Sequence, residues 1–184
     1  MSEEQAFPRN QVRCEGIFKK FGRKIVLNHV NMYTDIGEVV GLLGPNGSGK
    51  TTLFNIILGV VVPNSGKVYF SDRNITNIPI HRRARLGITY LQQETSVFRE
   101  MRVEENLKAI LEYQKLNSAE REEIVNRTLR EFGIESLKRQ YAFSLSGGEK
   151  RRLEIARMMV MKPKFVLLDE PFSGIDPKTV KEIQ

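Results

Sequence analysis

One eight-residue stretch constrains this chain more than any other, because it fits the phosphate-loop pattern G-x-x-x-x-G-K-[ST]: Gly44-Pro45-Asn46-Gly47-Ser48-Gly49-Lys50-Thr51. The apolar residues Val39 to Leu43 precede it without a helical period and predict a buried strand. Thr51 to Leu58 predicts a helix, with Gly59 as its C-terminal cap. In such a loop, backbone N–H groups and the helix N-terminus face phosphate oxygens. We therefore expect Lys50 to reach the β- and γ-phosphates of a nucleotide, the Thr51 hydroxyl to hold Mg²⁺, and Thr52 to adjoin them.

Composition narrows the class of protein less than this motif does. The 184 residues suffice for one α/β domain or one domain with a small insertion, and 40% hydrophobic with 28% charged residues is typical of a soluble globular chain. The net charge of +7 suits a nucleotide, a nucleic acid or an anionic membrane surface. One cysteine, Cys14, excludes an internal disulfide framework and is expected to be a packed core thiol. No apolar run reaches the ~18 residues of a membrane helix, so a membrane role requires a partner.

Segments ahead of the phosphate loop predict strands. Val12 to Phe21 predicts one strand before a turn at Gly22, and Ile25 to Leu27 and Val30 to Tyr33 predict further strand after it, so an antiparallel β lobe is expected. Phe21 is by default a core residue, and the functional alternative is that it stacks on a nucleotide base. The basic run within Ile75 to Arg85 predicts a solvated helix face, and a nucleic-acid patch stays open without interleaved aromatic residues to support it.

The chain is predicted to be mostly helical between Val103 and about Gln140, where it forms two helices. The first covers Val103 to Leu116; the second is capped by Asn117, with Glu120 completing a capping box. A further helix after Glu149 is expected to bury Leu153, Ala156, Met159 and Val160. Its N-terminus carries Lys150, Arg151 and Arg152, which oppose the helix dipole and indicate an anionic partner nearby.

Two acids follow the apolar residues Phe165 to Leu168, which predict a buried strand. Ligands bind beyond the carboxyl ends of strands in open α/β sheets. Asp169 suits positioning of Mg²⁺ through water, and Glu170 suits a general base for water that attacks the γ-phosphate. Gln93 ends a neighbouring strand and could contact Mg²⁺ or orient water. The plainer alternatives are a helix cap for Asp169 and a surface position for Gln93.

The residues Leu145-Ser146-Gly147-Gly148-Glu149 lie between the phosphate loop and the acid pair. They resemble the signature LSGGQ of ABC-transporter ATPases, with Glu149 in place of Gln. Four ordered motifs together resemble the ATPase subunits of this family over almost the whole chain. By the same resemblance Gln93 corresponds to the Q-loop glutamine, Asp176 to the D-loop, and Phe21 to the adenine-stacking aromatic, where many members have Tyr. The resemblance implies an α/β P-loop NTPase with a RecA-like core, an antiparallel β lobe and an inserted α-helical subdomain. We expect a single domain of residues 1–184. Residues of about 1–94 and 142–184 together form the β lobe and the RecA-like core, and residues of about 95–141 form the helical subdomain.

The family's mode of action supplies further expectations. Two subunits form a head-to-tail homodimer that sandwiches ATP and Mg²⁺ between the phosphate loop of one chain and Ser146, Gly147, Gly148 and Glu149 of the other. Tyr90 to Arg99 and Leu145 to Arg157 look most like lipopolysaccharide-export ATPases, which are related to those of branched-chain amino acid importers. There Phe98 and Arg99 match a groove that receives a helix from a transmembrane permease subunit; otherwise Phe98 is ordinary core and Arg99 ordinary surface. The resemblance implies a peripheral protein on the cytoplasmic face of the inner membrane, with no nucleic acid expected.

One departure from the family concerns the switch histidine, which lies after the acid pair on a later strand. The histidines here, His29 and His81, both precede Asp169, and the sequence stops at Gln184. We interpret the sequence as C-terminally truncated, because the upstream motifs are intact; the alternative is a degenerate subunit that binds ATP and hydrolyses it poorly. Two other function classes stay open: an ABC ATPase that acts on nucleic acid or ribosomes, and a non-catalytic regulatory subunit.

Overall fold

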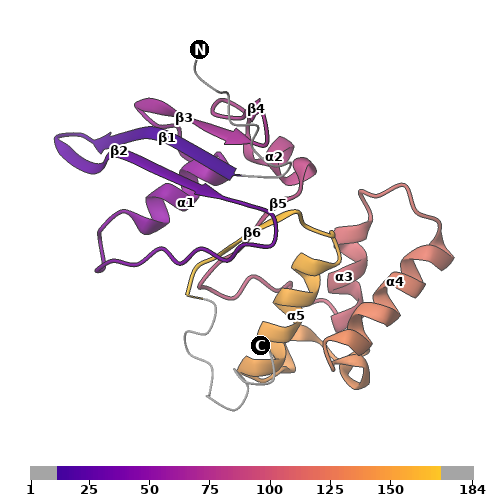
Figure 1. The fold of residues 1–184 in the computed structure, drawn as a ribbon. Helices are drawn as coiled ribbons and strands as arrows, with labels where there is room; N and C mark the ends of the chain where they lie inside the picture. Colours follow the sequence, from indigo (N-terminus) through magenta and orange to yellow (C-terminus); the bar gives the residue numbers. More distant parts are fainter. Residues whose placement is uncertain (1–11, 171–184) are drawn as a thin grey trace. The chain divides into compact units, whose positions relative to one another are not determined.

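The computed structural model describes residues 12–170, which fall into two compact units that divide between Thr89 and Tyr90 (Figure 1). We call them the N-terminal unit and the C-terminal unit. Helices in residues 12–170 are all too short or too polar to cross a bilayer.

The N-terminal unit is built on a four-stranded antiparallel sheet in the order β2-β1-β3-β4. Its strands are β1 (Val12–Phe21), β2 (Lys24–Thr34), β3 (Ser65–Phe70) and β4 (Arg73–Asn74). Gly22, with φ 56°, makes the β1–β2 turn, and Phe21 pairs with Lys24 beside it. The predicted antiparallel lobe is confirmed.

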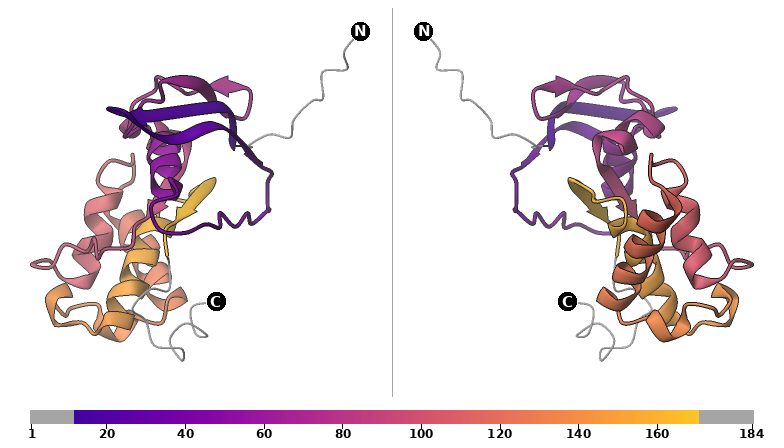
Figure 2. Two further views of the ribbon diagram at one scale, coloured as in Figure 1. Left: turned by 90° about the vertical axis from the view of Figure 1, so that its left-hand side faces the viewer. Right: turned by 90° about the vertical axis from the view of Figure 1, so that its right-hand side faces the viewer.

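Helix α1 (Lys50–Leu58) follows the phosphate loop and packs its apolar side under this sheet (Figure 2). Leu53, Ile56 and Ile57 are fully buried there, and so is Cys14 from β1. Burial raises the pKa of the Cys14 thiol to about 12, which confirms a packed, unreactive cysteine. Gly59 ends α1 in the left-handed conformation, as predicted, and its N–H donates to Ile56 O over 3.1 Å.

Helix α2 (Ile80–Leu86) corrects the expectation that the basic run lies wholly in solvent. Arg83 is only 2% exposed, and its guanidinium donates to four backbone carbonyls. Two belong to the last turn of α1, at Ile56 and Ile57 (both 2.7 Å), and two to Thr76 and Ile78 (2.8 and 2.6 Å). The last carbonyls of a helix have no partner within it, so a buried donor there is favourable.

The segment Val39 to Leu43 also departs from prediction. It is not a buried strand: it has no regular structure, and Val39 and Leu43 are 96% and 93% exposed. A buried strand needs a neighbour to pair with its N–H and C=O groups. Within residues 12–170 no strand pairs with this segment, so its apolar composition alone does not bury it.

The C-terminal unit packs three helices around one core: α3 (Val103–Leu111), α4 (Ser118–Glu131) and α5 (Gly147–Met159), seen together in Figures 1 and 2. Short 3₁₀ turns, η1 (Glu135–Leu137) and η2 (Ala142–Ser144), join α4 to α5. The capping box predicted for α4 is confirmed, since Asn117 Oδ1 accepts from Glu120 N over 2.9 Å and the Glu120 carboxylate accepts from Asn117 N over 2.8 Å. The first helix ends at Leu111 rather than Leu116.

Strands β5 (Ile88–Leu91) and β6 (Phe165–Leu168) pair in a two-stranded sheet. The prediction of a buried strand is only partly right for β6, because Leu167 is buried whereas Leu168 is 45% exposed. Within residues 12–170 β6 has a strand neighbour on one side only, so part of its surface is open.

Candidate functional site

The phosphate loop has the backbone geometry that its glycines predict. Gly47 and Gly49 adopt φ 79° and 98°, which disfavour other residues. A Cβ on Gly49 would lie 2.8 Å from Val26 O, so the space is also restricted. Gly49 is the N-cap of α1, where no side chain caps the helix and its first turn has no acidic residue. An anion is therefore the group that this helix start suits.

Lys50 lies on the loop itself. Its Nζ donates to Gly44 O over 2.6 Å and to Pro45 O over 2.9 Å, and Ser48 N donates to Pro45 O to close the turn. The ammonium thus stays beside backbone amides where a phosphate is expected to bind. Thr51 and Thr52 follow in the first turn of α1. This donor set, cationic and free of carboxylates, fits the phosphates of a nucleotide.

The acid pair and its glutamine come together in the C-terminal unit. Gln93 Nε2 donates to Glu170 Oε2 over 2.9 Å, although the residues are far apart in the sequence. Next to them, Asp169 N donates to Leu91 O over 3.0 Å, which continues the β5–β6 pairing. The structure therefore brings Gln93, Asp169 and Glu170 to one edge, where the two strands end.

Tyr90 is a member of this cluster that sequence reasoning missed. Its hydroxyl donates to Asp169 Oδ2 over 3.0 Å, and burial, helped by that bond, raises the pKa of Tyr90 to about 12. The tyrosine consequently stays a protonated donor and fixes the Asp169 carboxylate. The sequence does place a tyrosine in a predicted strand shortly before Gln93. Its partner Asp169 is identified only by the pairing of β5 with β6.

Glu170 also has an unusual backbone, with φ 45° in the left-handed region. This conformation is costly for a residue with a Cβ, and such strain concentrates at functional sites.

The signature residues form the start of α5. Ser146 is the N-cap: its Oγ accepts from Glu149 N over 3.3 Å, while Ser146 N and Oγ both donate to Glu149 Oε2 over 2.8 Å. The backbone hydrogen bond from Ser146 is the largest cause of the lowered pKa of the Glu149 carboxyl, and the bond from the Ser146 hydroxyl lowers this pKa further. Glu149 therefore completes a capping box, and Gly147 and Gly148 lie in the first turn.

The basic residues after the signature need a correction. Arg151 is buried, and its Nη1 donates to Glu154 Oε2 over 3.0 Å and to Gln92 O over 3.1 Å. For this residue the expected anionic partner is a carboxylate on the next turn of the same helix. Leu153, Ala156 and Val160 are buried as predicted, but Met159 is 42% exposed and does not face the core.

Three remaining candidates lie on the surface or beyond the described residues. Phe21 is 51% exposed with the Lys19 ammonium 5.0 Å from its ring centroid, so it is not core and has an open face. Phe98 is 44% exposed under the Arg157 guanidinium, 4.4 Å from its centroid, and so is not ordinary core either. Arg99 is exposed beside it. Asp176 lies outside residues 12–170.

Comparison with known proteins gives the family. The profile described as "ABC transporter" matches residues 27–173. The chain is 48% identical to "Lipopolysaccharide export system ATP-binding protein LptB" of Acidithiobacillus ferridurans, over 94% of this chain and 72% of that protein. It is also 48% identical to the protein of the same name in Escherichia coli K12, over 93% of this chain and 71% of that protein. The fold is similar to the solved structure of cbiO1 from Clostridium perfringens, part of the ABC transporter complex cbiONQ. The TM-score is 0.85 and the sequence identity 32%, and the match covers 95% of this chain and 71% of that chain. The chain belongs to the ABC transporter family, whose ATP-binding subunits hydrolyse ATP.

Proposed function

We propose that this chain energises a membrane transporter that exports lipopolysaccharide, as a peripheral subunit on the cytoplasmic face of the inner membrane. The cargo rests on the names of relatives that are 48% identical to it. In this proposal residues 95–141 act as a helical subdomain, and residues 1–94 with 142–184 act as β lobe and core. The observation that carries the catalytic part is the Gln93–Glu170 bond beside the Tyr90–Asp169 bond.

Phosphate binding falls to the loop and α1. Lys50 exchanges its bonds to two loop carbonyls for the β- and γ-phosphates, while the Gly47 and Gly49 backbone shapes the amide cradle. Bound Mg²⁺ neutralises charge on the phosphates, and the Thr51 hydroxyl would be its direct ligand from this loop. Phe21 offers its exposed ring to the adenine.

Proton transfer falls to Glu170. Gln93 donates to Oε2 of that carboxylate and fixes its orientation, and Oε1 would accept the proton of the attacking water. Tyr90 donates to Asp169 Oδ2 and so fixes the orientation of the carboxylate that would position the water shell of the metal. In this proposal Gln93 would in turn contact Mg²⁺ or the water itself.

A second copy of the chain completes each site. The Ser146 hydroxyl and the Gly147 and Gly148 amides would donate to the γ-phosphate held by the other subunit. Ser146 must first release the bond that its hydroxyl donates to Glu149. Force reaches the permease subunits through Phe98, an apolar anchor, and Arg99, a donor fork for helix-end carbonyls or carboxylates.

The direct test of the catalytic assignment is Glu170→Gln. Without the base, turnover should fall by about 10²-fold or more, while binding of ATP changes less than about twofold. Single-turnover hydrolysis and fluorescent-nucleotide titration measure the two quantities. Glu123→Gln, an exposed position on α4, is the matched control and should behave as wild type. Normal hydrolysis by Glu170→Gln would remove Glu170 from its role.

The cargo needs a separate experiment. Native protein purified from detergent-solubilised membranes should bring with it transmembrane permease subunits and lipopolysaccharide, identified by mass spectrometry. A different co-purifying solute would overturn the cargo assignment and keep the transporter. Recovery with DNA or RNA, in a salt-sensitive complex, would replace the transporter by an ABC ATPase that acts on nucleic acid.

A further inference from the structure

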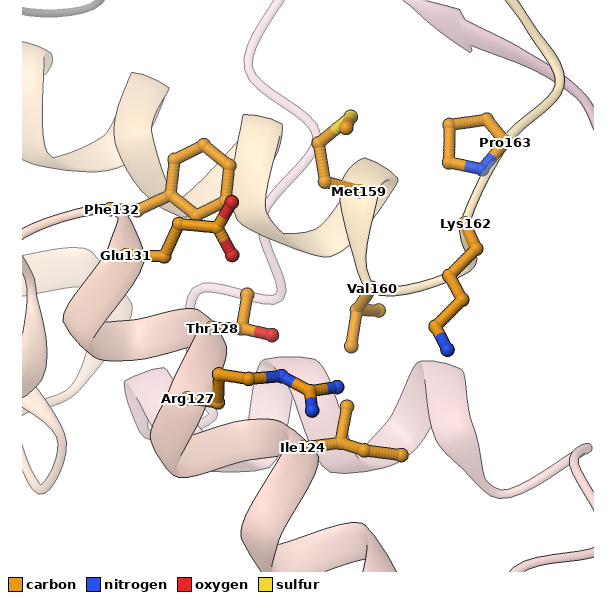
Figure 3. Close-up of a pocket in the computed structure, with 9 residues that line it drawn as sticks. All are labelled: Ile124, Arg127, Thr128, Glu131, Phe132, Met159, Val160, Lys162 and Pro163. Carbon is orange, nitrogen blue, oxygen red and sulfur yellow. The ribbon is translucent and has the colours of Figure 1, made fainter.

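A pocket in the C-terminal unit takes no part in the chemistry above. It has a volume of about 330 Å³ and lies between the C-terminal half of α4 and the end of α5 (Figure 3). Ile124, Phe132, Val160 and Pro163 supply apolar wall. The volume is at the lower end of the range for small-molecule sites, and a mainly apolar wall with a few polar groups is their usual composition.

Two cationic side chains line this α4–α5 pocket, Arg127 from α4 and Lys162 from the turn after α5. Figure 3 shows their charged ends on the side of Ile124 and Val160, whereas Phe132 closes the opposite side. Within residues 12–170 neither side chain has an ion pair or hydrogen bond, although this unit is otherwise rich in paired cations such as Lys108, Lys138 and Arg151. Two unpaired cations at one end of an apolar cavity make that end attractive to an anion.

We infer that the α4–α5 pocket binds a small amphiphilic anion, an alkyl chain or ring that carries one carboxylate or phosphate. The head group would lie between Arg127 and Lys162, and the apolar part would lie toward Phe132 and Met159. Glu131 lies beside Phe132 and repels a negative charge from that end, so the ligand has one favoured direction. The pocket-facing side chain of Thr128 offers an uncharged hydroxyl between the two ends.

This pocket is distinct from the signature residues of the same unit. The signature Ser146 caps the start of α5, and the pocket lies at Met159 and beyond, about 20 Å further along a 13-residue helix. A ligand here would bridge α4 to α5 at the end of α5 that is remote from the signature. The inference therefore goes beyond the proposed function and does not depend on it.

Calorimetric titration of the whole chain with octanoate and octyl phosphate tests the inference, with octanol as the uncharged probe. Both anions should bind at one site, and octanol at least about tenfold more weakly. Shortening the chain should weaken binding by about fourfold per methylene, because each methylene buried leaves water. No binding of either anion, or equal binding of octanol, would overturn the proposal.

Variants decide whether binding occurs in this pocket. Arg127→Glu combined with Lys162→Glu changes exposed side chains, so the fold should persist, and anion affinity should fall at least about tenfold. Lys115→Glu combined with Arg139→Glu, both exposed and outside the pocket, is the charge-matched control and should stay within about twofold of wild type. Equal losses in both would show a general charge effect and reject the site. A Thr128→Val variant tests the hydroxyl without a change of volume.

The same head-group chemistry occurs in free amphiphiles and in membrane lipids. Sedimentation with phosphatidylglycerol vesicles, compared with phosphatidylcholine vesicles, separates the two sources. Loss of vesicle binding in the Arg127→Glu, Lys162→Glu variant would assign the head group to a lipid, whereas binding of free octanoate alone would assign it to a soluble molecule. Absence of both would reject the site.

Discussion

Ser146 illustrates how one residue can serve both stability and chemistry. Its hydroxyl donates to Glu149 in this structure, and the same hydroxyl is the proposed donor to a γ-phosphate. Glu149 stands where the family signature has glutamine, so here the cap is charged. Because hydrogen bonds to the carboxylate lower its pKa, the cap favours the ionised form. The helix start that would face the nucleotide is thus sensitive to acid.

Replacement of that carboxylate should change the pH dependence of stability. The lowered folded pKa means that Glu149 stabilises the chain above its ordinary pKa near 4.5, and that this stabilisation is lost as pH falls through the lowered value. Glu149→Gln should therefore flatten the wild-type decline in stability as pH falls below about 5, an effect of up to about 1 kcal/mol for a solvent-screened cap. Urea unfolding at a series of pH values measures it. Identical profiles for the two proteins would contradict the role of the carboxylate.

At the scale of elements, α1 is held at both ends by different means. Its start carries the phosphate loop and has no side-chain cap, whereas its end is fixed by Gly59 and by the buried Arg83. Arg83 also holds the carbonyls of Thr76 and Ile78, so one guanidinium ties α1 to the approach of α2. Burial lowers the pKa of Arg83 to about 10, still far above neutral, and the cation persists. Arg83 thereby fixes the C-terminal end of α1, the helix whose N-terminal end carries Lys50.

Arg83→Met should be among the more damaging substitutions in the N-terminal unit. It would leave four carbonyls without their donor, at a cost of about 3 kcal/mol or more in the free energy of unfolding. Arg83→Lys should recover part of this, since an ammonium has three donors. Arg85→Met, exposed on the same helix, should change stability by less than about 0.5 kcal/mol. Equal midpoints of urea unfolding for the Arg83→Met and Arg85→Met variants would refute the anchoring role.

For the whole molecule, the division of the motifs between units has a consequence for assembly. The phosphate loop belongs to the N-terminal unit, and the acid pair and signature belong to the C-terminal unit. In the proposed function the signature serves the nucleotide of a second chain. ATP should therefore act as a link between two copies, and its hydrolysis should release them.

Glu170→Gln should trap that dimer. With ATP and Mg²⁺ its mass by light scattering should double relative to the ADP-bound form, because the step that opens the dimer is blocked. A second change, Lys50→Ala, should return the protein to the monomer by weakening ATP binding. A mass that stays constant with ATP would contradict the head-to-tail assembly.

The sequence by itself determined features whose physical cause is local. The capping box at Asn117, the glycine cap of α1 and the turn at Gly22 depend on residues within a few positions of one another. The phosphate loop and signature are likewise contiguous, so the family could be predicted from them.

Only the tertiary structure decided features that depend on distant partners. Arg83 is buried because carbonyls of α1 lie over it, and Val39 to Leu43 is exposed because no strand in residues 12–170 pairs with it. Tyr90 joined the candidate site only when β5 paired with β6 and placed Asp169 within hydrogen-bond distance. Composition and periodicity do not predict which distant side chains and backbone groups come into contact, because these contacts depend on how separate elements pack.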